Sequence, residues 1–336
     1  MIVAKYPATH GHTTVINNLC VGLSKLGYRT AIGAFSFSKS PPNNIEMIKL
    51  DKFKLLTKGI DYLGFDIVHS HQPRVNYYLL FKKSLKPILL HYHGASNFVQ
   101  RINFILMMSI FRKRISKIIS VSKSGISQME KMIGKVNAEV IYNGVNTSFY
   151  FPELEKKYNV GNPELIFVSA LREYKKTSFL INAMPQLLKK YPNAHLQIVG
   201  TGEELENLKS LIKKLNIEKF VELTGKISDD ELRYRYVSSD VYVSASQFEV
   251  CPVPTLEAMS CGKPLLLCDI EPHLEIVEQS NAGLIFHFSD VKDYLQNFEK
   301  VFSNKLSFSK NATGFAKSVN WEIICKKTAK IYENLI

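Results

Sequence analysis

Two glutamates in the segment Ser244 to Pro264, which reads SASQFEVCPVPTLEAMSCGKP, are the residues best suited to chemistry. Glu249 follows the apolar run 241–243, and Glu257 lies in a stretch that predicts a helix ending before Gly262. A strand, a turn and a helix would bring both acids to the carboxyl edge of a parallel sheet, where open α/β folds bind ligands. Two carboxylates in that position are suited to bind hydroxyl groups.

Three cations, Arg172, Lys175 and Lys176, follow the apolar run 165–169 and precede a helix expected from about Thr177. The N-terminus of a helix attracts anions through its free N–H groups and its dipole, and fixed cations there would complete a diphosphate site. A lysine pair alone is more often a solvated turn. Because these cations and the two glutamates follow strands of the same domain, we expect both sets to face one crevice.

Short β-branched runs alternate with longer stretches of helical period along the chain, with helices expected at 13–26 and 122–132. The expected strands lie at 2–4, 29–34, 66–70, 87–91, 117–121 and 139–142, and then at 165–169, 194–199, 220–223, 241–244, 264–268 and 283–286. This alternation predicts parallel sheets with helices on both faces, and it occurs twice. The fold class is therefore α/β, with two doubly wound domains.

The predicted domain boundary falls within 145–163, where turn formers accumulate after the strand pattern stops. We expect an N-terminal domain over residues 1–145, a second domain over 146–319 and a last helix over 320–336. Apolar residues recur at helical spacing in this last segment. From the spacing alone, it could be one more helix covering the second domain.

The composition favours a reducing, cytoplasmic setting. The five cysteines are an odd number without a C-x-x-C pair, so neither a disulfide framework nor a structural zinc site is expected. Asp269 and Glu271 could suggest a metal site, but acids at such positions more often cap a helix. No signal peptide is expected at the start, and no stretch approaches the roughly 20 apolar residues that span a bilayer.

The net charge of +13 is unevenly distributed. Residues 1–150 hold 20 Lys and Arg against 6 Asp and Glu, whereas residues 151–336 hold 23 against 24. Such asymmetry indicates that the first domain meets a polyanion, either nucleic acid or an anionic membrane surface. No motif that reads DNA or RNA is recognisable, so we expect no nucleic-acid partner and a peripheral position on the inner face of the cell membrane.

The segment 101–117, RINFILMMSIFRKRISK, is the expected focus of this charge because a mostly apolar run leads into four cations. A basic amphipathic helix lying among lipid headgroups has this pattern, and each cation near anionic lipid contributes about 1 kcal/mol. A core helix that ends in a solvated basic turn has the same pattern. The sequence leaves both interpretations open.

Together these motifs resemble those of retaining, nucleotide-sugar-dependent glycosyltransferases of family 4, also called glycosyl transferases group 1. The resemblance covers nearly the whole chain. It is strongest at FEVCPVPTLEAMSCGKP, which is similar to the family's E-x7-E motif, and at LREYKK, which is similar to its phosphate-binding Arg and Lys. Supporting matches are VIYNGVN at 140–146, IVGTG at 198–202, LTGKI at 223–227, DIVHSH at 66–71 and HYHG at 91–94.

This resemblance implies the GT-B architecture, in which two Rossmann-like domains face a central cleft and the last helix crosses back to the first domain. It implies transfer of a hexose-type sugar from a UDP-, GDP- or ADP-sugar to a hydroxyl acceptor, either a glycan or a lipid-linked molecule. Neither a cofactor nor a metal ion is implied. A nucleotide-sugar epimerase of the same fold and a non-catalytic sugar-nucleotide-binding protein are the alternatives.

By the same resemblance, Arg172 and Lys175 would neutralise the leaving diphosphate, and Glu257 would accept hydrogen bonds from the ribose hydroxyls. Glu249 would hold the sugar, and His93 would lie near the sugar from the first domain. Further contacts to the donor are implied for Gly11, Gly202, Lys226, Val250, Cys251 and Val253.

Two positions depart from the family's pattern. His12 follows Gly11 where the family usually has a second glycine, and Pro252 stands in a segment that is often Gly-Phe-Gly in the family. Proline has no N–H to donate, so the grip on the sugar would differ in detail.

Overall fold

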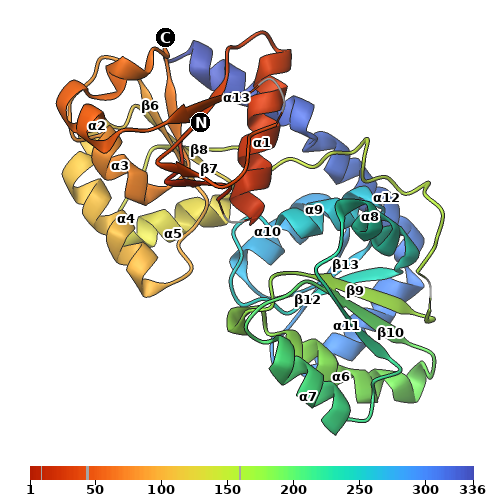
Figure 1. The fold of residues 1–336 in the computed structure, drawn as a ribbon. Helices are drawn as coiled ribbons and strands as arrows, with labels where there is room; N and C mark the ends of the chain where they lie inside the picture. Colours follow the sequence, from red (N-terminus) through yellow and green to blue (C-terminus); the bar gives the residue numbers. More distant parts are fainter. Residues whose placement is uncertain (9, 43–44, 159) are drawn as a thin grey trace. The chain divides into compact units, whose positions relative to one another are not determined.

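The computed structural model describes residues 1–8, 10–42, 45–158 and 160–336. These residues divide into two compact units, each of which mixes helices and parallel strands (Figure 1). Unit 1 comprises Met1–Gly144 and Trp321–Ile336, and unit 2 comprises Val145–Asn320. We describe each unit by itself.

The sheet of unit 1 is parallel and is joined through the amino-terminal residues. Ile2 forms parallel bridges to Gly33 and to Ser70, so the first residues lie between β2 and β5. The neighbouring pairs are β2 with β4, and then β5, β6, β7 and β8 in that order. The bounds are β2 (Ala31–Ala34), β4 (Glu46–Lys49), β5 (Val68–Ser70), β6 (Ile88–Tyr92), β7 (Lys117–Ser120) and β8 (Ala138–Val140). A separate two-stranded sheet pairs β1 (Lys5–Tyr6) with β3 (Ser36–Phe37).

Helices cover this sheet on both faces. On one face, α1 and α13 pack together, as the red and blue helices in Figure 1 show, and their apolar residues share a core with Leu89 and Ile119 of the strands. On the other face, Phe104 and Met108 pack with Leu90. The helices are α1 (His10–Lys25), α2 (Lys52–Lys58), α3 (Pro73–Leu79), α4 (Phe98–Phe111), α5 (Lys123–Ile133) and α13 (Trp321–Glu333), with short 3-10 helices η1 (Ile60–Leu63) and η2 (Arg112–Arg114).

The sheet of unit 2 has six parallel strands in the order β11-β10-β9-β12-β13-β14. In order of appearance along the chain this is 3-2-1-4-5-6, the Rossmann arrangement, and the order reverses between β9 and β12. The bounds are β9 (Glu164–Val168), β10 (His195–Val199), β11 (Val221–Gly225), β12 (Val241–Ser244), β13 (Leu265–Cys268) and β14 (Gly283–Phe286).

The strands of unit 2 are apolar almost throughout because helices cover both faces of a parallel sheet. Leu265, Leu266 and Leu267 of β13, for example, are all fully buried. The covering helices are α6 (Thr177–Lys190), α7 (Leu205–Lys214), α8 (Asp229–Ser238), α9 (Val253–Ser260), α10 (Glu271–Ser280), α11 (Val291–Ser303) and α12 (Lys305–Ser318), with the 3-10 helix η3 (Glu173–Lys175) before α6.

The expected α/β class with two doubly wound sheets is confirmed, with corrections at several elements. The helix expected at 13–26 begins three residues earlier, at His10. The strand expected at 2–4 is reduced to the bridges of Ile2, and that expected at 139–142 lies at Ala138–Val140. The strand Glu46–Lys49 was not predicted, because it is mostly exposed and lacks the apolar alternation that marks a buried strand.

Candidate functional site

The loops that follow β9 and β12 lie next to each other in unit 2. The two strands are paired in parallel, with Leu165 opposite Val241 and Ile166 opposite Tyr242. Their carboxyl ends therefore meet at one sheet edge, at the point where the strand order reverses. This is the position at which open α/β sheets bind ligands.

Three contacts join these loops. Lys175 Nζ forms an ion pair with Glu249 Oε1, and only 12% and 15% of the two side chains are exposed. The backbone N–H of Gln247 donates to the carbonyl of Tyr174 at 2.8 Å, and the rings of Tyr174 and Phe248 meet edge-on at 6.1 Å. The structure thus brings together the cation and the first glutamate that the sequence placed in separate motifs.

The loop after β9 presents positive charge at the start of α6. Lys175 closes the 3-10 helix η3, and Lys176 adopts a left-handed conformation (φ 48°) that starts α6 without a side-chain cap. The first N–H groups of α6 are therefore free of a side-chain acceptor. Arg172 is exposed, and its guanidinium makes no hydrogen bond to any residue that the structure describes. An anion at this position would meet Arg172, Lys175 and the positive end of a helix.

Glu257 lies on α9, partly buried, with two tyrosines beside its carboxylate. Tyr236 donates its hydroxyl to Glu257 Oε2 at 3.1 Å, and Tyr150 also hydrogen-bonds the carboxylate. Burial raises the pKa of Glu257 to about 7, against the lowering effect of the Tyr236 hydrogen bond. The carboxylate is therefore close to its protonation midpoint at neutral pH, and hydroxyl donors that bind the ionised form would favour ionisation.

Gly202 has a packing role in the same region. A Cβ atom at this position would overlap the carbonyl oxygen of Leu171, and one at Gly200 would overlap that of Ser169. The turn after β10 therefore packs directly against the segment that leads to Arg172. Only glycine allows this close approach of two backbones.

The remaining residues implied in donor binding by unit 2 lie in loops or at the start of a helix: Lys226, Val250, Cys251 and Val253. Lys226 is exposed and directly follows β11, while Val250 and Cys251 are buried after Glu249. Val253 is the first residue of α9, and Pro252 stands before it as the N-cap. Within the described chain, the N–H groups of Val250 and Val253 donate to no protein acceptor, so two donors remain in the segment that follows Glu249.

His93 and Gly11 belong to unit 1. His93 follows β6 and is half-buried, and its Nε2 lies 2.9 Å from His71 Nδ1. The ring of His12 lies 4.5 Å from that of His93. Gly11 is exposed in the first turn of α1, and none of the described atoms outside its own helical turn and chain neighbours would approach an added Cβ within 4 Å.

The sequence analysis missed His273, which lies on α10 and is fully buried. Its Nδ1 lies 2.9 Å from the carbonyl oxygen of Cys268, and its Nε2 has no partner among the described residues. Burial lowers the pKa of His273 to about 4, while the charges of Glu249 and Lys175 oppose each other there. No sequence signal marks this histidine, because only the return of α10 to the sheet edge brings it near that ion pair.

Asp269 is engaged within the protein. Its carboxylate pairs with His287 Nδ1 at 3.0 Å and accepts the N–H of Phe288 at 3.0 Å. His287 and Phe288 directly follow β14, so these two contacts hold the loop after that strand in place. This role is structural, but it is not the expected helix cap, because the N-cap of α10 is Ile270 and no side chain caps that helix.

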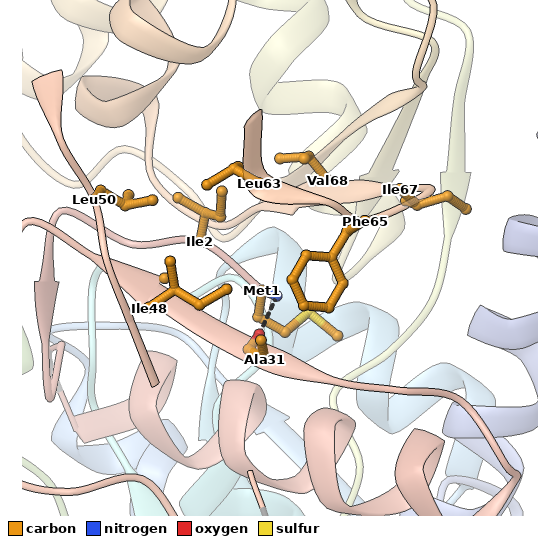
Figure 2. Close-up of a pocket in the computed structure, with 10 residues that line it drawn as sticks. Met1, Ile2, Ala31, Ile48, Leu50, Leu63, Phe65, Ile67 and Val68 are labelled. Carbon is orange, nitrogen blue, oxygen red and sulfur yellow. Dashed lines mark hydrogen bonds between the residues drawn. The ribbon is translucent and has the colours of Figure 1, made fainter. Parts of the chain in front are cut away.

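A small cavity lies in unit 1 near the amino terminus, between apolar side chains that include Ile2, Leu50 and Phe65 (Figure 2). Its volume is about 30 Å³. Such a space is too small for a sugar or a nucleotide, whose binding pockets are about ten times larger or more. The cavity therefore does not identify a substrate site.

The membrane-spanning potential of the described helices is low. None of them combines the length and the apolar character that crossing a bilayer requires.

Comparison with known proteins agrees with these observations. The family model "Glycosyl transferases group 1" matches residues 151–318, and "Glycosyltransferase Family 4" matches residues 9–149. An uncharacterized glycosyltransferase of Methanocaldococcus jannaschii is 26% identical, over 98% of this chain and 96% of its own length. Alpha-monoglucosyldiacylglycerol synthase of Acholeplasma laidlawii is 24% identical, over 60% of this chain and 51% of its own.

Among solved structures, HepE of Anabaena in complex with UDP is similar in fold. Its TM-score is 0.83 and its sequence identity 17%, and the match covers 99% of each chain. The two family models together span nearly the whole sequence, and the first alone matches unit 2 with its charged loops. The chain belongs to the glycosyl transferases group 1 family and is a glycosyltransferase with the GT-B fold.

Proposed function

We propose that this glycosyltransferase moves a hexose from a nucleoside-diphosphate sugar to a hydroxyl group of a lipid-linked or glycan acceptor. The transfer retains the anomeric configuration and uses no metal ion. The observation that carries this proposal is the Lys175–Glu249 pair at the switch point of the Rossmann sheet, beside the uncapped start of α6.

The cations support a diphosphate at this position. Cleavage of the bond between the anomeric carbon and the phosphate oxygen leaves the electron pair on the diphosphate, whose charge must be stabilised. Arg172, Lys175 and the N-terminus of α6 supply fixed positive charge at the required place. When the diphosphate engages Lys175, the carboxylate of Glu249 becomes able to accept hydrogen bonds from the sugar.

Glu257 supports a ribose contact. Its carboxylate already accepts a hydroxyl donor from Tyr236, and two ribose hydroxyls would add donors of the same kind. Ionisation of Glu257 would then be coupled to donor binding, because the neutral acid accepts fewer hydrogen bonds.

The names of the similar proteins support the donor class and the stereochemistry. HepE was solved with UDP, and the Acholeplasma relative is named for the synthesis of an alpha-glucosyl lipid. Nucleoside-diphosphate glucose donors are themselves alpha-linked, so an alpha product requires retention. In the proposed step, the acceptor oxygen bonds to the anomeric carbon on the face from which the diphosphate leaves. The acceptor proton then passes to the departing phosphate oxygen.

The exposed face of α4 supports a lipid surface as a partner. One side of this helix buries Phe104, Met107 and Phe111 in the core of unit 1. Another side leaves large apolar residues exposed, at intervals of four along the helix: Phe98 (76%), Ile102 (39%), Leu106 (51%) and Ile110 (63%). The core and amphipathic interpretations of this segment thus apply to different sides of the same helix.

Cations and further apolar side chains adjoin this face. Arg112–Arg114 follow α4 directly and are exposed, and the Arg114 guanidinium donates to the carbonyl of Phe81. Phe81 is 57% exposed and Leu85 fully exposed, with two lysines between them. Apolar residues among cations are the pattern of a surface that inserts into an anionic lipid layer. We call this set the α4 surface.

A transfer assay tests the proposal. The protein is incubated with labelled UDP-, GDP- or ADP-glucose and with vesicles that contain diacylglycerol and anionic lipid. We expect label in the lipid extract with one of the donors, in the presence of EDTA as in its absence. An epimerised nucleotide sugar, donor binding without any product, or a loss of activity in EDTA that magnesium restores would each contradict part of the proposal.

A further inference from the structure

Four histidines form a column on one face of the sheet in unit 1. His69 and His71 lie at the end of β5, and His91 and His93 lie at the end of β6, which pairs with it in parallel. One residue separates the members of each pair, so their side chains point to the same face of the strand. The ring centroids of His69 and His91 are 5.1 Å apart, and those of His71 and His91 are 5.0 Å apart.

Burial leaves several of these imidazole nitrogens without a partner. His69, His71 and His91 are 2%, 1% and 4% exposed. Within the described part of the chain, His69 Nε2 and both nitrogens of His91 make no hydrogen bond. Each such buried polar atom costs about 1 to 3 kcal/mol, which an aliphatic side chain would avoid. Packing alone does not account for three imidazoles here.

The hydrogen bonds around the column are compatible with free nitrogen lone pairs. His69 Nδ1 lies 2.6 Å from the Tyr332 hydroxyl, which itself points to Met1 Sδ at 3.9 Å. If Tyr332 donates to the sulfur, it accepts the N–H of His69 Nδ1, and the lone pair of His69 then resides on Nε2. His71 Nε2 lies 3.2 Å from Met1 Sδ, which has no proton to donate, so in this contact Nε2 donates its N–H to the sulfur. Metal binding at His71 Nε2 therefore requires the other tautomer of this ring, with the proton on Nδ1.

One ligand atom from each of His69, His71 and His91 lies within 4.8 Å of the other two. A metal ion that binds three imidazoles at about 2.0 Å holds their nitrogens about 3.3 Å apart. The rings stack in the structure, with 7° between the planes of His69 and His91, so binding requires rotation about χ2. That torsion is broad for histidine.

We propose that His69, His71 and His91 form a binding site for Cu(I) in unit 1. Imidazole suits several transition metals, and the thioether of Met1 beside His71 adds a soft ligand that favours copper in its lower oxidation state. The charges that act on these rings come from the amino terminus and from other histidines, all of them positive when ionised. A divalent ion would bring twice the uncompensated charge into this core, so the monovalent ion is preferred.

The three histidines belong to unit 1, whereas the charged loops proposed for glycosyl transfer belong to unit 2, and the site adjoins His93. The 2.9 Å contact between His71 Nδ1 and His93 Nε2 means that a metal on the other nitrogen of His71 would assign the shared proton to Nδ1. His93 would then act as the acceptor in that hydrogen bond. Tyr332 plays the same part for His69: its hydroxyl contacts Nδ1, the nitrogen that would not bind the metal.

The test is an anaerobic titration of the full chain with Cu(I) in competition with bicinchoninate. We expect one equivalent to bind to the wild type. His91→Leu, which removes two unpartnered nitrogens, should bind at least about tenfold more weakly, and Tyr332→Phe should also weaken binding by about tenfold or more. His287→Gln, which alters an exposed histidine of unit 2, should bind as the wild type does.

Equal affinity of the wild type and a folded His91→Leu would overturn the proposal, and tighter binding of Zn(II) than of Cu(I) would overturn the choice of ion. X-ray absorption on the loaded wild type provides a readout that does not depend on the folding of variants. Three imidazole nitrogens at about 2.0 Å are expected around the copper. A first shell without imidazole would reject the site.

Discussion

At the scale of single residues, the proposed function gives the charge chemistry to the cations and the hydroxyl contacts to the glutamates. Lys175 and Glu249 come from different loops and meet in an ion pair with little exposure. Glu257 lies deeper, against Tyr236. The environment therefore separates the two acids: one is balanced by a lysine, and the other has its pKa raised by burial.

We expect Lys175→Ala to lower the turnover number by at least about a hundredfold, because the diphosphate loses a preorganised cation. Initial rates at saturating donor measure this. Lys189→Ala is the matched control, since Lys189 is an exposed lysine of α6 outside the site. Turnover of Lys175→Ala close to that of the wild type would remove this residue from the mechanism.

Donor affinity should depend on pH through Glu257. Burial raises its pKa to about 7, so the carboxylate is mostly protonated at about pH 6 and mostly ionised at about pH 8. In the proposed function the ionised form of Glu257 accepts the ribose hydrogen bonds, so we expect binding of UDP, or of the preferred nucleotide, to tighten with rising pH. Calorimetric titrations across this range measure it. In Glu257→Gln the same dependence should be absent, and a wild-type profile that is already flat would refute the role.

At the scale of elements, close backbone contacts position the loops of unit 2. The turn after β10 approaches the turn after β9 so closely that Gly200 and Gly202 have no room for a side chain. The N–H of Leu171 donates to the carbonyl of Thr201 at 3.0 Å, and the N–H of Glu204 donates to the carbonyl of Leu171 at 3.1 Å. Arg172 therefore follows a segment whose position depends on the neighbouring turn.

Gly202→Ala should displace that segment, because the new methyl group would overlap the backbone of Leu171. We expect weaker donor binding together with a loss of about 1 to 3 kcal/mol in the free energy of unfolding. Gly314→Ala is the control, since nothing described lies near its Cβ position on α12. That substitution should instead stabilise the protein by up to about 1 kcal/mol. Urea unfolding of both variants measures these changes in stability. An unchanged free energy of unfolding in Gly202→Ala would contradict the packing role.

The α4 surface provides a second prediction at this scale. Leu106→Asp and Ile110→Asp should each weaken binding to vesicles that contain anionic lipid, because a charge replaces an exposed apolar side chain. Co-sedimentation with vesicles measures the bound fraction. Leu306→Asp changes an exposed leucine of unit 2 and should bind as the wild type does. Undiminished vesicle binding of both α4 variants would mean that this helix is not the contact.

At the scale of the whole molecule, the net positive charge and most of the buried histidines belong to the amino-terminal part of the chain. Burial lowers the pKa of His12, His69, His71 and His93, and lowers that of His91 to about 3. Unfolded histidine titrates near pH 6.5. The unfolded chain therefore binds protons below about pH 6.5 that the folded chain does not.

Unit 1 should consequently lose stability in mild acid. Each histidine that stays neutral in the folded state lowers the free energy of unfolding by about 1.4 kcal/mol per pH unit below about pH 6.5. Trp321, the single tryptophan, lies in unit 1 and reports its unfolding by fluorescence. We expect the fluorescence transition in urea to move to lower concentrations as the pH falls from about 6.5 to about 4.5. The shift should be smaller in His91→Leu, and an equal shift in that variant would show that His91 is not responsible.

Much of this protein could be predicted from local sequence patterns. Buried parallel strands are nearly continuous apolar runs, as at 265–267, and glycine and proline mark where strands and helices end. Each of these signals is local, because an apolar run and the glycine or proline that ends it are close in the sequence. The sequence alone was therefore enough to predict the α/β alternation and to select both glutamates and the cations after β9 as candidate site residues. The exposed edge strand Glu46–Lys49 carries no such signal and was missed.

Only the tertiary structure decided which of these residues meet. The Lys175–Glu249 pair depends on β12 inserting beside β9, the histidine column depends on the register of β5 with β6, and the exposed side of α4 depends on which side the core covers. Strand order, register and helix orientation arise from contacts between segments far apart in the chain, and no local pattern encodes them. The sequence by itself therefore determined the chemical groups, and the packing of distant segments determined their partners.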